Sequence, residues 1–170
     1  MSPERLEQLL AEVEHDVASA RAMRLLGYRE RSRVELRARL TEDGFPAQVV
    51  TDVIERMEQI GALDDARFAE AYIRTKVAAG WGRDRIVRGL TAAGLEPDRV
   101  APRLEEEAPA AQELDRALAM LPADPPRDRR ERERLVRRLV SRGFSYDVAR
   151  TAIEQHSCVD NDSIRNRFES

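Results

Sequence analysis

Apolar residues recur along the chain at helical spacing, and glycine interrupts the pattern. Leu36 and Leu40 precede Gly44, and further apolar residues follow from Val49 at i, i+1, i+4, i+5 and i+8. Because one face of an α-helix repeats about every 3.6 residues, this spacing predicts two short amphipathic helices joined by a glycine turn. Residues 32–35 have the Ser-x-x-Glu spacing of a capping box, which predicts where the first of these helices begins.

The same pattern occurs three times. Ile86 and Leu90 precede Gly94 in the second copy, and two leucines precede Gly143 in the third. A further helical stretch lies upstream of each copy, so the repeating unit contains three helices. A period of this length is typical of stacked helical modules. The sequence therefore predicts an all-α fold, with three tandem three-helix repeats forming an elongated, curved array behind an extra N-terminal helical lead-in.

The copies are imperfect, and the domain boundaries follow from where each copy begins. Pro102 falls within the last helix of the second repeat, which predicts that this helix kinks or starts late. The end of the chain has little apolar periodicity. The predicted divisions are a lead-in over 1–16, repeats over 17–63, 64–108 and 109–156, and a frayed or disordered tail over 157–170.

The composition excludes several classes of protein. Hydrophobic residues make up 42% of the chain, charged residues 36% and aromatic residues 5%, which is typical of a water-soluble helical protein with small cores. Cys158 is the single cysteine, so no internal disulfide is expected. The N-terminus lacks the pattern of a signal peptide, and no run of about 18 apolar residues occurs. We therefore expect a cytoplasmic protein without a membrane span.

The formal net charge of -3 hides a segregation of charge along the chain. Residues 21–40 carry seven arginines against two acids, net +5; residues 74–89 carry five basic residues against one acid, net +4; residues 127–142 carry eight arginines against three acids, net +5. Residues 42–70 hold eight acids against two arginines, net -6, and residues 96–115 hold seven against two, net -5. Each repeat is therefore predicted to have a basic middle helix.

Two interpretations of this segregation are open. Basic and acidic helices could simply pair with each other and form a soluble surface. Alternatively, the basic helices could lie on one face and present a stripe to a polyanion or to an acidic protein groove. Tyr72 and Trp81 are the only aromatic residues near the stripe, so readout of bases is poorly supported. The candidate partner-binding residues are Arg33, Arg37, Arg74, Lys76, Arg83, Arg85, Arg88, Arg134, Arg137 and Arg138.

No set of residues in the sequence is arranged as a catalytic or metal site. Asp64 and Asp65 stand at the start of a predicted helix, where aspartate most often caps the helix. His15 and His156 are far apart, and the single cysteine has no further ligands near it. The Gly-Trp-Gly sequence at 80–82 lacks the lysine and serine of a phosphate loop. We therefore expect a binding protein that is not an enzyme, with no cofactor and no metal.

Residues 63–86, LDDARFAEAYIRTKVAAGWGRDRI, resemble a specific signature of the RecX family of bacterial regulatory proteins. The resemblance runs from about Ala22 to Leu95 and continues weakly through the third repeat. It implies tandem three-helix repeats. It also implies binding in the groove of the RecA filament on DNA, with inhibition of ATP hydrolysis, strand exchange and co-protease activity in recombination and the SOS response. The positions that match the family pattern, most of them structural, are Asp65, Phe68, Ala69, Tyr72, Gly80, Gly82, Ile86, Leu90 and Gly94.

Two other functions remain compatible with the residues. Paired helices joined by a glycine turn resemble helix-turn-helix geometry, so the chain could bind DNA directly. It could also be a helical-repeat adaptor for another acidic protein. As partners we expect the RecA filament and, weakly and without sequence preference, the DNA phosphate backbone. We expect the protein itself to be a monomer.

Overall fold

The computed structural model describes the backbone of residues 2–168 and the side chains of residues 2–158 except 3 and 6. In that part of the chain, all regular secondary structure is helical. The predicted all-α repeat fold is confirmed. The elements are α1 (Pro3–Tyr28), α2 (Arg33–Glu42), α3 (Ala47–Gln59), α4 (Asp65–Ala78), α5 (Arg83–Ala92), α6 (Pro97–Glu107), the 3-10 helix η1 (Ala110–Gln112), α7 (Glu113–Ala119), α8 (Arg129–Ser141) and α9 (Tyr146–Phe168).

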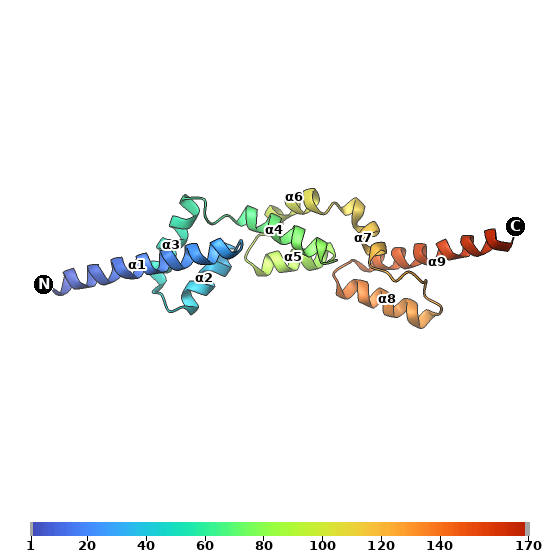
Figure 1. The fold of residues 1–170 in the computed structure, drawn as a ribbon, viewed down its shortest axis with the longest axis horizontal. Coiled ribbons are helices and arrows are strands. Elements are labelled where there is room, and N and C mark those ends of the chain that lie inside the picture. Colours follow the sequence, from blue (N-terminus) through green and yellow to red (C-terminus); the bar gives the residue numbers. More distant parts are fainter. Residues whose placement is uncertain (1, 169–170) are drawn as a thin grey trace. The chain divides into compact units, whose positions relative to one another are not determined.

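The chain forms two compact units, whose boundary falls inside α4 (Figure 1). Unit 1 contains the residues up to Ala71 together with Ala92–Glu96, and unit 2 contains Tyr72–Thr91 and the residues from Pro97 onward. These two units do not coincide with the three expected repeats. They do not test the repeat boundaries expected at residues 64 and 109, which stay predictions.

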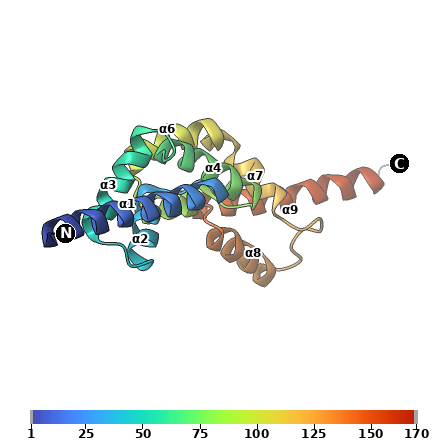
Figure 2. The ribbon, with the colours of Figure 1, turned by 60° about the vertical axis from the view of Figure 1, so that its left-hand side comes forward.

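Unit 1 is built around the predicted glycine turn between α2 and α3. Gly44 has φ +91°, a left-handed conformation that glycine adopts without steric cost. Ser32 is fully buried, and its hydroxyl accepts a hydrogen bond from the Glu35 N–H at 3.1 Å, as the capping box predicts. α1 lies against α2 and α3 (Figure 2). The core contains Ala18, Ala22, Leu25, Leu36, Leu40, Val49, Val50, Val53, Ile54, Met57 and Leu63.

The expected lead-in and the first repeat helix are one continuous helix, α1, of 26 residues. Its start is fixed by Ser2, whose side chain accepts a hydrogen bond from the backbone of Arg5 at 3.3 Å, and by the proline that follows in the first turn. The first half of α1 runs on beyond α2 and α3 (Figure 1).

The acidic pair at the start of α4 corrects one expectation. Asp64 caps α4, because its Oδ1 accepts from the N–H groups of Ala66 and Arg67 at 2.8 and 3.2 Å. Asp65 does not cap its own helix: its Oδ1 accepts from the backbone N–H of Arg33 at 2.8 Å. Asp65 therefore satisfies a free N–H at the start of α2, which sequence spacing alone could not indicate.

One core of unit 2 lies where α7 and α8 pack against α9. Leu135, Leu139, Phe144 and Ile153 are buried there. α6 begins at Pro97 although Pro102 lies inside it, so the late start that Pro102 suggested is not observed.

α9 continues as a helix to Phe168, where we expected a frayed or disordered tail from residue 157. No glycine or proline occurs between Tyr146 and Phe168 to end the helix, which explains why it continues. The last two residues of the expected tail, 169 and 170, lie outside the described residues.

Candidate partner-binding surface

The ten basic residues predicted to bind a partner lie on four helices rather than on three middle helices. Arg33 and Arg37 are on α2 in unit 1, and the other eight are in unit 2. Arg74 and Lys76 belong to the end of α4 and not to α5, which corrects the assignment of residues 74–89 to one basic middle helix. The ten also differ in what their side chains contact.

Arg33 and Arg74 form close ion pairs with acids on other helices. Arg33 Nη1 lies 2.6 Å from Glu58 on α3, and Arg74 Nε lies 2.8 Å from Glu107 on α6. The hydrogen bond from Arg74 lowers the pKa of the Glu107 carboxyl below its ordinary value. At both positions the structure contains the pairing of basic and acidic helices that we considered as the simpler interpretation.

The contacts of Arg83 hold α5 to the end of α6 and to the start of α7. Its guanidinium donates to the carbonyl of Ala108 and lies 3.0 Å from Glu105, so it binds the C-terminal end of α6. Its backbone N–H donates to Glu113 at 3.0 Å. Only 19% of the side chain is exposed. Arg83 therefore has little donor capacity left for a partner.

Lys76 and Arg85 both contact the ring of Trp81. The Lys76 Nζ lies 4.5 Å and the Arg85 guanidinium carbon 3.8 Å from the ring centroid. Lys76 also lies 5.1 Å from the ring of Tyr72. Cation–π contacts of this kind hold the charge over an aromatic face. The half-buried Arg37 donates to the hydroxyl of Thr51 at 3.2 Å.

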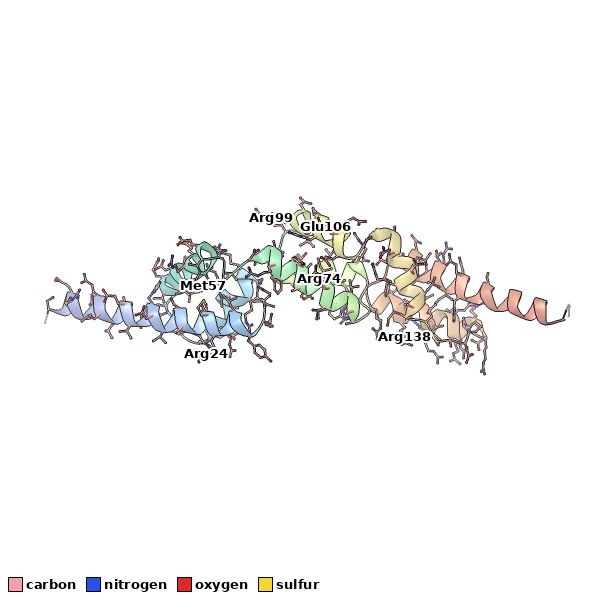
Figure 3. All side chains as sticks on the ribbon, turned by 45° about the horizontal axis from the view of Figure 1, so that its top comes forward. Arg24, Met57, Arg74, Arg99, Glu106 and Arg138 are labelled. Carbon is pink, nitrogen blue, oxygen red and sulfur yellow. The ribbon has the colours of Figure 1, made fainter. Side chains whose placement is uncertain are left out.

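Arg88, Arg137 and Arg138 have exposed side chains that form no hydrogen bond or ion pair with any side chain described. Arg134 comes no closer than 3.9 Å to Glu131 and is 72% exposed. Figure 3 shows Arg138 at the surface of α8 and Arg74 on α4, facing the region of α6. Of the ten predicted residues, those that are free to meet a partner thus lie mainly on α8, with one on α5.

An open depression of about 300 Å³ on α8 adds one arginine that the sequence prediction omitted. Its basic lining residues are Arg130, Arg134 and Arg137, at i, i+4 and i+7, and its acidic lining residues are Asp128 and Glu131. The helical spacing of the three arginines could have identified Arg130, because such positions share one face.

The family-pattern residues have mainly structural surroundings. Gly80 and Gly94 have φ values of +74° and +88°. Gly82 is buried and lies against the α8–α9 turn. Tyr72 is half-buried, and its hydroxyl approaches Gly89. Apart from Asp65, described above, the remaining positions are buried core residues, namely Phe68, Ala69, Ile86 and Leu90.

The described residues include no group of three or more histidine, cysteine or acidic side chains that could hold a metal ion. Within the same part of the chain, no helix is both long and apolar enough to cross a membrane.

Comparison with known proteins gives consistent matches. The model of the first three-helix domain of RecX matches residues 18–57, and that of the second matches residues 64–101. The regulatory protein RecX of Chromohalobacter salexigens is 37% identical over 133 residues, which cover 78% of this chain and 88% of that protein. The regulatory protein RecX of Mycolicibacterium smegmatis is 32% identical over 137 residues, covering 75% and 72%.

Solved structures show the same fold. The crystal structure of RecX from Lactobacillus salivarius superposes with a TM-score of 0.72 at 19% identity, covering 86% of this chain and 99% of that one. A second crystal structure, of regulatory protein RecX, gives a TM-score of 0.75 and covers 91% and 78%.

Proposed function

The chain belongs to the RecX family of regulatory proteins, and on that premise we propose that it binds the RecA–DNA filament and inhibits the ATPase, strand-exchange and co-protease activities of RecA. In this proposal the protein acts by binding, without chemistry of its own, in the cytoplasm where RecA filaments assemble. The regulation concerns recombination and the SOS response.

The observation that carries the proposal is the set of exposed arginines without internal partners on α5 and α8. Guanidinium groups that have no carboxylate partner keep all five donors for the phosphates or carboxylates of another molecule. Of the ten predicted residues, Arg88, Arg137 and Arg138 meet this condition with respect to the side chains described. Complementary charge of this kind accelerates association and selects the partner.

The proposed contact with DNA is a weak one, made to phosphate groups. Trp81 and Tyr72 are already in contact with the Lys76 ammonium, so they are poorly placed to stack on bases. Contact with phosphates alone depends steeply on salt and has no sequence preference. We therefore assign specificity to the RecA protein of the filament.

The test measures ATP hydrolysis by RecA on single-stranded DNA while the concentration of this protein is increased. We expect wild-type protein to lower the rate, and we expect the triple variant Arg88→Glu/Arg137→Glu/Arg138→Glu to lose the effect with unchanged helical content. The matched control reverses three exposed acids, Glu55→Lys/Asp98→Lys/Asp115→Lys, and should inhibit about as well as wild type.

Three outcomes would contradict the proposal in different ways. Full inhibition by the arginine variant would place the RecA contact elsewhere. Tight, sequence-dependent binding to duplex DNA without RecA would favour direct DNA recognition. Wild-type protein without any effect on RecA, but retained by another acidic protein, would favour the adaptor function.

A further inference from the structure

The outer face of the first half of α1 carries exposed apolar side chains. Leu10, Val13 and Val17 are 56%, 59% and 53% exposed. Single exposed apolar residues are common, but three on one face of one helix form a patch that a monomer leaves in contact with water.

These three residues have the spacing of a coiled-coil seam. Leu10, Val13, Val17, Ala20 and Arg24 alternate steps of three and four residues, which is the a/d pattern of a heptad. The core-facing residues of α1 are Ala18, Ala22 and Leu25. At about 100° per residue the seam lies on a different side of the helix. Figure 3 agrees, because Arg24 and the core residue Met57 lie on opposite sides of α1.

Charge along α1 is divided between its two halves. Residues 3–16 carry five acids against one arginine, net -4, whereas residues 17–28 carry two arginines and no acid, net +2. Glu7 and Arg24 are exposed and make no ion pair with the side chains described. Two such helices attract each other when they run antiparallel and repel when they run parallel, because only the antiparallel arrangement sets acidic halves against basic halves.

We propose that α1 is the docking surface for a second copy of this chain, whose own α1 packs against it in antiparallel orientation. The two-fold axis passes near residue 15, so that Val13 lies opposite Val17 of the second copy and Leu10 lies opposite Ala20. In this register, in which the numbers of directly opposed residues add up to 30, Glu7 lies opposite Met23 of the second copy and therefore one residue away from Arg24. The contact is isologous, as closed dimers require.

This inference is independent of RecA binding and departs from the expectation of a monomer. An interface limited to one helix face is small, so the dimer is in exchange with monomer at micromolar concentration. α1 residues before Ala18 lie outside the part matched by the first RecX domain, which begins at residue 18.

Sedimentation velocity over about 1 to 300 µM protein, the range in which a small interface associates, tests the proposal. We expect the weight-average sedimentation coefficient of wild type to rise with concentration. The variant Val13→Glu/Val17→Glu should sediment as a monomer throughout, with unchanged helical content. The matched control Ile60→Glu/Tyr146→Glu, which changes two apolar residues that are 48% and 64% exposed outside α1, should behave as wild type.

A charge exchange and a cross-link test the orientation without relying on an apolar substitution. Arg24→Glu should weaken dimerisation, and adding Glu7→Arg should restore it. In a Cys158→Ser background, Val13→Cys/Val17→Cys should form a covalent dimer on mild oxidation, and Val13→Cys alone should form little. A monomer at every concentration would overturn the proposal, and efficient cross-linking of Val13→Cys alone would overturn the antiparallel orientation.

Discussion

Gly94, in the turn after α5, lies directly against the side chain of Val34 in α2: a Cβ atom at position 94 would lie 2.2 Å from Val34 Cγ2. Gly44 occupies the equivalent turn after α2 and has nearly the same φ, +91° against +88°, but a Cβ there would meet nothing within 4 Å. Two glycines with the same place in the sequence pattern thus have different packing.

Gly94→Ala should destabilise unit 1 more than Gly44→Ala does. Both substitutions place a side chain in the left-handed region, which costs about 1 kcal/mol, and only the first also forces Val34 to move. Urea unfolding measures the two free energies. Combining Gly94→Ala with Val34→Ala should recover the extra loss, and a double mutant that shows no coupling would mean that the two residues do not press on each other.

Gly82→Ala should destabilise unit 2 by roughly 2 kcal/mol or more, as expected for a strained close contact. A Cβ at Gly82 would lie 2.2 Å from the carbonyl of Gly143, and the Gly82 N–H donates to the Arg142 carbonyl at 2.9 Å. Thermal melting followed by Trp81 fluorescence, next to the site of change, measures the effect.

The control for Gly82→Ala is Gly27→Ala, which we expect to raise stability rather than lower it. Gly27 lies inside α1, and a Cβ there would meet nothing within 4 Å. Gly27→Ala should therefore stabilise the protein by about 0.5 to 1 kcal/mol through helix propensity. Equal melting temperatures for the two variants would contradict the close packing of Gly82.

Sequence patterns predicted the parts of the fold that depend on neighbouring residues. The turn at Gly44 and the Ser32 cap of α2 follow from local spacing, and the left-handed Gly44 and the hydrogen bond from the Glu35 N–H to the Ser32 hydroxyl are both observed. The contact of Asp65 with Arg33 joins residues 32 positions apart, and no local pattern indicates it. The continuity of α1 also needed the structure, because a helical pattern alone does not say whether a lead-in and the first repeat helix are one helix or two.

The candidate site was predicted less completely for a similar reason. Counting charges identified the basic segments correctly, but a count does not show which arginine has an internal partner. Arg83 binds the end of α6, whereas Arg88, five residues later, has no partner among the side chains described. Only the three-dimensional arrangement separates a structural arginine from a free one.

The free energy of unfolding should fall as the pH is lowered below about 4, near the ordinary pKa of aspartate and glutamate. Hydrogen bonds from Arg21 to Asp43 and from Arg74 to Glu107 lower the pKa of each carboxyl in the folded state. A carboxyl with a lowered folded-state pKa stabilises the fold above its unfolded pKa and loses that contribution as the pH falls through the folded value.

Urea unfolding at pH 7, 5, 4 and 3, a series that spans the ordinary carboxyl pKa values, checks this expectation. Asp43→Asn should lower stability at neutral pH and make the loss in acid shallower. Glu55→Gln is the control, because Glu55 is exposed and forms no ion pair with the side chains described. An identical pH profile for wild type and Asp43→Asn would show that the Arg21 pair does not contribute.

Arg83→Glu and Arg88→Glu make the same change of charge five residues apart on α5 and should differ in what they damage. Arg83→Glu removes charge-assisted contacts at the C-terminal end of α6 and places a carboxylate beside Glu105, so it should destabilise unit 2 by roughly 2 to 3 kcal/mol. Arg88→Glu changes an exposed side chain, so its effect on the free energy of unfolding should stay within about 0.5 kcal/mol.

Chemical unfolding and RecA inhibition are measured for both variants. If Arg88 is a partner contact, its variant loses inhibition while it remains stable, whereas the Arg83 variant loses inhibition only to the extent that it unfolds. A stable Arg83→Glu protein would instead show that Arg83 does not hold α6, and Arg83 would then join Arg88 as a candidate contact.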